Sequence, residues 1–255
     1  MCLLVFSFRQ RAEYPFVFAS NRDEFLDRPT APMHFWEDAP DVLAGRDLRS
    51  GGTWLGLTRT GRFATVTNYR EVGRAKPDAP TRGRLPVRFL LGDDAPAAFL
   101  DRLEPEAHRY NGFNLLVGAG GALHYFSNRG ARRALTPGLY GLSNHLLDTP
   151  WPKVVRAKDL LRTILEAERI EPEALFALLA DETKAPDDAL PDTGVGLEWE
   201  RLLSPIFIRS PKYGTRASTV VLTNRRGGTD VYERTFPVDG STPFTRHFRL
   251  PKGRL

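Results

Sequence analysis

The chain has 255 residues, 41% of them hydrophobic and 26% charged, which is typical of a globular protein of one large or two small domains. No run approaches the ~18 apolar residues of a membrane span, the short apolar opening lacks the basic segment of a signal peptide, and one cysteine excludes an internal disulfide and favours a reducing, cytoplasmic setting. The net charge of +5 comes without a helix-turn-helix, zinc-finger or aromatic RNA-binding motif, so we expect no nucleic-acid partner.

The opening segment predicts a hairpin. Two apolar runs, residues 2–8 and 16–20, flank a polar stretch, and a turn over residues 10–13 would place Cys2 opposite Asn21. The second strand runs on into Asn21-Arg22-Asp23-Glu24. In an extended strand Asn21 and Asp23 face one way and Arg22 and Glu24 the other, so we expect one of the two pairs to be structural.

The rest of the first half alternates turns and apolar runs. It predicts a loop at residues 26–40 and a strand at 41–47. A second hairpin follows at 54–57 and 63–68, then an exposed loop at 69–85 and two helices at 86–92 and 94–109. A two-residue turn in the second hairpin would place Asn68 opposite Thr53. The neighbouring Gly51 and Gly52 favour close approach of a ligand or another backbone.

The second half returns from helices to strands. It predicts a third hairpin at residues 113–118 and 122–128 and two short strands at 133–136 and 140–143. Two helices follow at 151–167 and 172–179, and then a flexible loop at 184–196. Four strands follow, at residues 205–208, 218–223, 229–236 and 244–250. Hairpins at both ends and helices in the middle predict one α+β domain over residues 1–255, with mostly antiparallel sheets.

Cys2 is the first candidate for chemistry. An initiator methionine is usually removed before a small residue, and removal would give Cys2 both a thiol and a free α-amine. The amine can then take the thiol proton, so one residue serves as nucleophile and base. Arg22 across the hairpin would favour the thiolate, Asp23 would hold the ammonium or orient Arg22, and Asn21 would donate to an oxyanion. The alternative is that Cys2 is a small buried hydrophobe.

Other candidates have structural alternatives too. Asn68 and Asn144 are possible oxyanion donors or turn residues that bond local backbone. Arg216 could bind an anionic ligand or be an ordinary surface arginine. Trp54 could line a pocket or pack in the core. Five histidines without paired spacing make a protein-built zinc site improbable, and we predict no metal site. His145 suits an axial ligand, a proton relay or a structural role.

The motifs resemble those of one family, the NRDE family of the transport and Golgi organisation protein 2. The matching pieces are Met-Cys-Leu-Leu at 1–4, Ala-Ser-Asn-Arg-Asp-Glu-Phe at 19–25, Ala-Gly-Arg-Asp at 44–47, Gly-Gly-Thr-Trp-Leu-Gly at 51–56, Thr-Asn-Tyr-Arg at 67–70, Gly-Leu-Ser-Asn at 141–144 and Tyr-Gly-Thr-Arg at 213–216. They run in order through nearly the whole chain.

The family is in turn similar to N-terminal nucleophile hydrolases, which implies a four-layer αββα sandwich. Cysteine members such as choloylglycine hydrolases and penicillin V acylases begin Met-Cys, cleave amides and carry Arg-x-x-Asp on the second strand. Here Arg22 and Asp23 are adjacent, so the resemblance leaves open whether they or Asn21 with Glu24 take those places. It also implies that Asn68 and Asn144 bind the oxyanion, while Arg216 is a less secure match to a later arginine.

Two functions follow from these features. The first is an N-terminal cysteine amidohydrolase that needs no cofactor and cleaves an amide of a small or acyl substrate with Cys2, Arg22, Asp23, Asn68 and Asn144. Asn21, Glu24, Trp54 and Arg216 would bind that substrate. The second, implied by animal members of the family, is a non-catalytic carrier of haem, with Cys2 and His145 as candidate ligands, or of an acyl lipid or acyl-CoA. The oligomeric state stays open.

Overall fold

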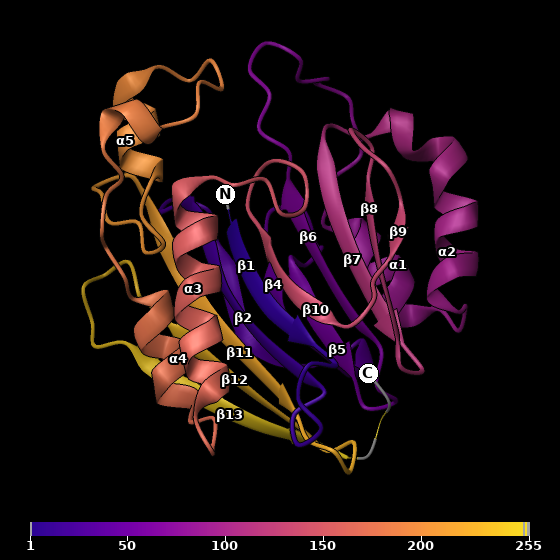
Figure 1. Cartoon of the computed structure of the whole chain (residues 1–255). Helices are drawn as coiled ribbons and strands as arrows, with labels where there is room; N and C mark the ends of the chain where they lie inside the picture. Colours follow the sequence, from indigo (N-terminus) through magenta and orange to yellow (C-terminus); the bar gives the residue numbers. More distant parts are fainter. Residues whose placement is uncertain (1, 252, 254–255) are drawn as a thin grey trace.

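The computed structural model describes residues 2–251 and 253. In this part of the chain the strands form two antiparallel sheets that pack face to face, and helices cover the outer face of each sheet (Figure 1). The predicted α+β fold, a four-layer αββα sandwich of antiparallel sheets, is confirmed.

The first sheet has the strand order β10-β1-β2-β11-β12-β13. Its strands are β1 (Cys2–Phe8), β2 (Phe16–Phe25), β10 (Gly138–Leu142), β11 (Tyr213–Thr223), β12 (Thr229–Thr235) and β13 (Phe244–Leu250). β1 has a partner on each side, β2 and β10, so its backbone groups are bonded along both edges.

The second sheet has the order β3-β4-β5-β6-β7-β8-β9. Its strands are β3 (Thr30–Trp36), β4 (Ala39–Asp47), β5 (Leu55–Thr58), β6 (Phe63–Asn68), β7 (Phe113–Ala119), β8 (Ala122–Ser127) and β9 (Arg133–Ala134). Neighbouring strands of this sheet follow one another in the sequence, so it is a meander, and two α-helices lie in the long connection between β6 and β7.

The helices form the two outer layers. They are α1 (Arg84–Leu91), α2 (Pro96–Leu103), α3 (Pro152–Glu166), α4 (Pro172–Leu179) and α5 (Leu197–Leu203), with short 3₁₀ turns η1 (Glu104–Arg109) and η2 (Asp187–Ala189). α1 and α2 pack on the second sheet, while α3 and α4 pack on the first. None of the helices among the described residues is long and apolar enough to cross a bilayer.

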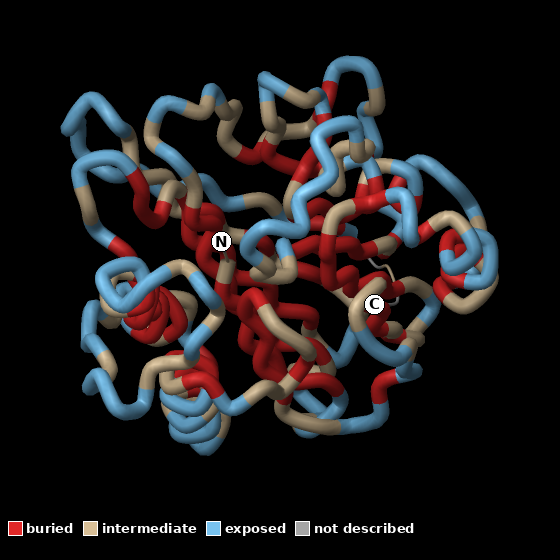
Figure 2. The backbone as a smooth tube through the Cα atoms, turned by 90° about the horizontal axis from the view of Figure 1, so that it is seen from above, coloured by how far each residue is buried: buried red, intermediate tan, exposed pale blue. Residues whose placement is uncertain are grey.

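Apolar side chains fill the spaces between the layers. Phe6 and Phe18 of the first sheet meet Phe63 of the second, and the Phe18 and Phe63 ring centroids lie 5.1 Å apart at 71°. Leu3 and Val5 of β1 face the other way, toward α3 and α4. The strand is therefore apolar on both faces because both are covered, and Figure 2 shows the buried backbone running through the middle of the molecule.

The predicted register of the first hairpin is wrong by one residue. Phe8 pairs with Phe16, and Arg9 donates its backbone N–H to the Pro15 carbonyl at 2.7 Å, so Cys2 lies opposite Arg22 and not Asn21. Arg9 has a positive φ of 52°. Pro15 has no N–H to return the bond, and the turn closes one residue later than a four-residue turn would.

The second hairpin is also shifted. Leu57 pairs with Phe63, and the turn contains three residues with Gly61 at φ 85°. A three-residue turn with a left-handed glycine is a common hairpin connection. The β5–β6 ladder pairs Leu55 with Thr65, one residue away from the predicted register, so the prediction that Asn68 lies opposite Thr53 is wrong; on the other edge of β6, Asn68 pairs with Phe113 of β7.

Two other predictions fail, and one helix was not predicted. The predicted loop over residues 26–40 contains the edge strand β3, whose bulge at Pro32 tolerates the missing N–H. The segment 205–208 is buried but forms no strand, because an Asn21 amide N–H and the Asp181 carbonyl bond its backbone instead. Helix α5 follows the predicted flexible loop, over residues for which no element was predicted.

Candidate active site

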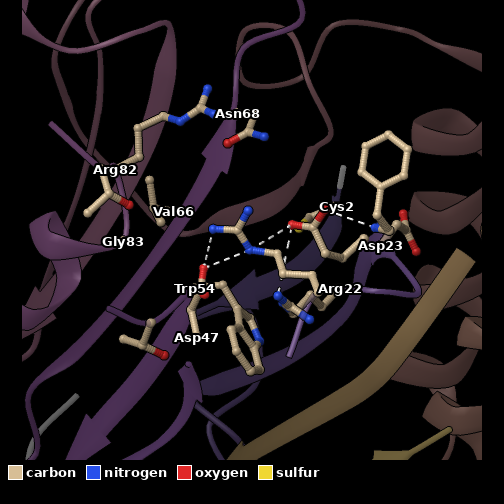
Figure 3. Close-up of a pocket in the computed structure, with 14 residues that line it drawn as sticks. Cys2, Arg22, Asp23, Asp47, Trp54, Val66, Asn68, Arg82 and Gly83 are labelled. Atoms are coloured by element: carbon tan, nitrogen blue, oxygen red, sulfur yellow. Dashed lines mark hydrogen bonds and ion pairs between the residues drawn. The ribbon is translucent and has the colours of Figure 1, made fainter. Parts of the chain in front are cut away.

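A cavity of about 280 Å³ opens where β2, β4 and β6 end and β1 and β5 begin, against the segment that enters α1. Its wall contains six of the predicted residues, namely Cys2, Arg22, Asp23, Glu24, Trp54 and Asn68. In Figure 3, Cys2, Arg22 and Asp23 come from the first sheet, while Trp54 and Asn68 come from the second. The strand ends therefore bring together a thiol, charged groups of both signs and an amide.

Cys2 sits at the start of β1, in the wall of the cavity. Its side chain is partly buried, and its carbonyl accepts a hydrogen bond from the Ser143 hydroxyl at 3.2 Å. Burial raises the pKa of the Cys2 thiol above its ordinary value. The backbone N–H of Asp23 and the charge of Arg22 act in the opposite direction on that pKa, because both stabilise a thiolate.

Arg22 faces Cys2 and is only 5% exposed. Its guanidinium lies over the Trp54 ring, 4.2 Å from the centroid, and forms an ion pair with Glu24 at 3.9 Å. Burial lowers the Arg22 pKa, although a guanidinium keeps its proton near neutral pH. Trp54 and Glu24 thus hold a positive charge next to the thiol.

Asp23 is buried and fixed by hydroxyl groups. Thr215 Oγ1 donates to its Oδ1 at 2.7 Å, and the Tyr213 hydroxyl donates to its backbone carbonyl at 3.1 Å. Burial raises the pKa of the Asp23 carboxyl, and the charge of Lys153 opposes that rise. A β-bulge in β11 lies opposite this stretch. Bulges twist strands and re-aim side chains, and Arg22, Asp23 and Glu24 all line the cavity here.

Lys153, at the start of α3, is a buried charge that the sequence analysis did not single out. It is 4% exposed, its Nζ donates to the Pro205 carbonyl at 3.3 Å, and burial lowers its pKa to about 8. The signal was present, since Lys153 lies four and eight residues before Ala157 and Leu161 on the buried face of the helix.

Asn21 lies outside the cavity wall. Its Nδ2 donates to the carbonyls of Leu179 and Ile206 at 2.8 and 2.9 Å, and its Oδ1 accepts from the Ser218 hydroxyl at 2.6 Å. These bonds tie β2 to β11, to the end of α4 and to the segment after α5. Among the residues Asn21–Glu24, Asn21 is therefore the structural member.

Asn68 and Asn144 lie together beside the cavity. Asn144 Nδ2 donates to the Asn68 backbone carbonyl at 2.8 Å, which joins the end of β10 to the end of β6 and so bridges the two sheets. A second cavity of about 270 Å³ adjoins the first, and both residues line it. Asn68 lines both cavities, whereas Asn144 lines only the second. An amide nitrogen carries two hydrogens, so Asn144 keeps one N–H beyond its bond to Asn68.

Arg216 lies outside both cavities. Its Nη1 donates to the backbone carbonyls of Phe25, Leu26 and Arg28 at 3.1 to 3.3 Å. These bonds hold the turn that follows β2. In this position Arg216 supports the shape of the site.

Three charged residues of the first cavity were not predicted. Arg28 donates to Asp47 Oδ2 through Nε and Nη2 at 2.9 and 2.6 Å, and both lie in the cavity wall. Arg82 lines the first and the second cavity. Asp47 had a signal in the sequence, because it ends a predicted strand and the family motif at residues 44–47, whereas Arg82 had only its position before a helix.

His145 uses both ring nitrogens. Nε2 hydrogen-bonds the Tyr69 hydroxyl at 2.7 Å and Nδ1 hydrogen-bonds the Thr149 hydroxyl at 2.8 Å. Within residues 2–251 and 253, no group of three or more histidine, cysteine, aspartate or glutamate side chains could hold a metal ion.

Known proteins are similar to this chain over most of its length. The family described as Transport and Golgi organisation 2 matches residues 1–237. The Transport and Golgi organization protein 2 homolog of Bos taurus is 36% identical over 275 residues, covering 98% of this chain and 99% of that protein. The Homo sapiens homolog is 36% identical and the Drosophila melanogaster protein 30% identical, each covering 92% of both chains.

Two solved structures are similar at low identity. A mutant of the conjugated bile acid hydrolase from Clostridium perfringens has a TM-score of 0.46 at 10% identity, covering 97% of both chains. An N-acylethanolamine-hydrolyzing acid amidase ortholog from Caenorhabditis elegans has a TM-score of 0.40 at 12% identity, covering 87% of this chain and 92% of that one. The family match and the relatives in sequence confirm the resemblance inferred from the motifs: the chain belongs to the Transport and Golgi organisation 2 family.

Proposed function

We propose that the protein is an N-terminal cysteine amidohydrolase that cleaves the C–N bond of a small or acyl amide. The observation that carries this proposal is the shared cavity: Cys2, Arg22, Asp23 and Asn68 all line one space of about 280 Å³. A nucleophile, a cation beside it, a buried carboxylate and an amide donor are the parts that acyl transfer needs.

The first half of the reaction uses Cys2 alone as nucleophile and base. With Met1 removed, the α-amine of Cys2 takes the thiol proton while sulfur attacks the carbonyl carbon. The carbonyl oxygen becomes an oxyanion, for which the amides of Asn68 and Asn144 are the proposed donors. Arg22 favours the thiolate before attack, and Asp23 favours the ammonium that forms.

The second half releases the products. The intermediate collapses, the C–N bond breaks, and the ammonium gives its proton to the departing amine. Water then attacks the thioester; the α-amine takes a proton from that water and returns it to the thiolate as the C–S bond breaks. The net reaction consumes one water and yields an acid and an amine.

The space for substrate extends beyond the first cavity. The adjoining cavity has a volume of about 270 Å³, and Tyr69, Val72, Ala75 and Val195 add apolar surface to its wall. Phe25, half exposed, lines the first cavity. This distribution suits an acyl group that lies against the apolar surface while its amide reaches Cys2.

Intact mass and covalent labelling test the proposal together. The mature protein should lack Met1, because a retained methionine leaves Cys2 without a free amine and removes the base. An acyl probe that forms a thioester should label the purified protein once, since the chain contains a single cysteine. Cys2→Ser should abolish that label. The matched control is Ser7→Cys in the Cys2→Ser background, which restores a buried thiol elsewhere on the same strand and should not be acylated.

The second candidate function is a carrier that binds an acyl group without cleaving it. The same apolar surface from Val72 and Val195 favours it, because that surface serves cargo as well as substrate. Titration of Cys2→Ser with an acyl-CoA and with haem separates the two functions. Saturable binding together with no turnover by the wild type would favour the carrier, whereas turnover of a bound acyl amide would exclude a purely passive role.

A further inference from the structure

Arg82 differs from the other arginines around the two cavities. Arg22 pairs with Glu24 at 3.9 Å, Arg28 with Asp47 at 2.6 Å, and Arg70 with Glu200 at 2.6 Å. For Arg82 the structure gives one hydrogen bond, from Nη1 to the Gly112 carbonyl at 3.0 Å. Among residues 2–251 and 253 no carboxylate forms an ion pair with it.

The position of Arg82 makes this difference costly. The side chain is partly buried, and burial lowers its pKa. A guanidinium stays protonated all the same, so the charge is held partly away from water without a carboxylate in contact. A bound anion would compensate that charge, as carboxylates do for the neighbouring arginines.

The surroundings show where such an anion would lie. Arg82 and Asn68 are shared between the two cavities, and Cys2 lines the first of them. In Figure 3 the Arg82 guanidinium and the Asn68 amide are aimed at the same corner of the cavity. Thr53 donates its backbone N–H to the Gly83 carbonyl at 3.1 Å, which ties the segment carrying Arg82 to the second sheet.

We propose that Arg82, with Asn68 beside it, binds an anionic oxygen group of the ligand, a carboxylate or a phosphate, at the junction of the two cavities. The identification of that ligand as the substrate rests on the proposed amidohydrolase function; the anion site itself does not. The planar guanidinium fork matches either group through two parallel hydrogen bonds. The substrate class is accordingly an acyl amide that carries a negative charge.

The single cysteine gives a direct test that needs no turnover. Cys2 is alkylated with a series of ω-bromoalkanoates and with the matching neutral ω-bromoalkanamides, and each rate is divided by the rate with glutathione. The carboxylate series should react roughly tenfold faster than the amide series at the chain length that spans from Cys2 to Arg82, because a charge-assisted hydrogen bond favours the anion by about that factor. A parallel series of ω-bromoalkylphosphonates distinguishes a phosphate site from a carboxylate site.

Variants then assign the preference to Arg82. Arg82→Gln should bring the ratio of the carboxylate rate to the amide rate close to the ratio that glutathione itself shows. Arg82→Lys should keep part of the wild-type preference for the carboxylate. Arg49→Gln, an exposed arginine two residues beyond Asp47, makes the same charge change nearby and should leave the ratio unchanged. Added salt should lower the wild-type ratio, since mobile ions screen the charge.

Each outcome decides the matter. A wild-type ratio equal to that of glutathione at every chain length overturns the anion site without any variant, even if Arg82→Gln fails to fold. An anion preference that survives in Arg82→Gln also overturns it and assigns the preference to other charges. A protein that shows the Arg82-dependent preference but never forms a thioester keeps the anion site and discards the hydrolase.

Discussion

Cys2 lies directly opposite Arg22 in the β1–β2 ladder, and the Arg22 guanidinium lies over the Trp54 ring, 4.2 Å from its centroid. A partly buried thiol therefore has a fixed cation as its cross-strand neighbour. Burial and charge act against each other here: burial raises the Cys2 pKa, and the arginine lowers it. The reactivity of Cys2 depends on the balance of these two effects.

Replacing Arg22 with glutamine should make Cys2 less reactive. The change removes the positive charge, so the pKa of the thiol should rise further and the alkylation rate at neutral pH should fall. A charge interaction of about 1 kcal/mol corresponds to roughly fivefold. The rate of iodoacetamide labelling as a function of pH measures both quantities. Arg22→Lys, which keeps a charge, should lie between the wild type and glutamine; a midpoint that stays in place or moves down in Arg22→Gln would contradict this account.

The buried carboxyl group of Glu233 should make the free energy of unfolding fall as pH rises. This side chain on β12 is fully buried between the sheets, where Met33 N–H donates to its Oε1 at 2.5 Å, and burial raises its pKa from 4.5 to about 7. The folded state thus keeps a proton that the unfolded chain releases above pH 4.5. Stability is fully present below that pH and is lost as pH rises through 7, by up to about 3 kcal/mol.

Glu233→Gln tests this dependence, because an amide of similar shape carries no titrating proton. Urea unfolding at pH 5 and pH 8 should show a larger loss of free energy in the wild type than in the variant. Asp23, whose pKa burial also raises, titrates in the same direction and is present in both proteins. The comparison therefore isolates Glu233, and equal losses in the two proteins would rule out its contribution.

The ion pair between Arg70 and Glu200 should hold α5 against the body of the protein. Their side chains are 6% and 5% exposed, the Nη1 to Oε2 distance is 2.6 Å, and Arg70 also lies over the Trp151 ring at 4.7 Å. Removing one partner leaves a buried charge, so Glu200→Leu and Arg70→Met should each lower the free energy of unfolding by about 3 kcal/mol. The double variant should lose much less than the sum, and urea unfolding of the four proteins gives the coupling. Additive losses would show that the two charges do not depend on each other.

These charges show what the sequence could and could not reveal. Apolar runs predicted most strands and helices, and the motifs predicted that Cys2, Arg22, Asp23 and Asn68 belong to one site. The register of the first two hairpins could not be predicted, because the turns that contain or adjoin Pro15 and Gly61 are each one residue longer than expected. This difference moved Asn21 and Asn68 relative to their expected partners. A strand has a period of two, and a one-residue error reverses its faces.

Ion pairs between residues far apart in the sequence could not be predicted, for a different reason. Arg70 and Glu200 are 130 positions apart, and no spacing rule links them. Neither Lys153 nor Glu233 was singled out from the sequence: helical spacing places Lys153 on the buried face of α3, but Glu233 is buried against Met33 of the opposite sheet. Buried charge is set by tertiary contacts, whereas periodicity reports only which face of an element is apolar.

Gly52 offers the last test, since it fixes the wall that carries Arg82. A Cβ at Gly52 would lie 2.6 Å from the backbone carbon of Gly83 and 2.7 Å from its oxygen, and backbone cannot move aside as a side chain can. Gly52→Ala should therefore push the entrance to α1 away from the cavity and lower the free energy of unfolding by about 1 to 3 kcal/mol.

The neighbouring Gly51 is the matched control for this change. It has a φ of +70° and no atom within 4 Å of its added Cβ, so Gly51→Ala should cost only about 1 kcal/mol of backbone strain and leave the cavity intact. Urea unfolding compares the stabilities of the two variants. Alkylation of Cys2 by the bromoalkanoates reports the wall: the anion preference should fall in Gly52→Ala and persist in Gly51→Ala. If both alanines behave alike, the contact between Gly52 and Gly83 does not position Arg82, and the anion site depends on some other support.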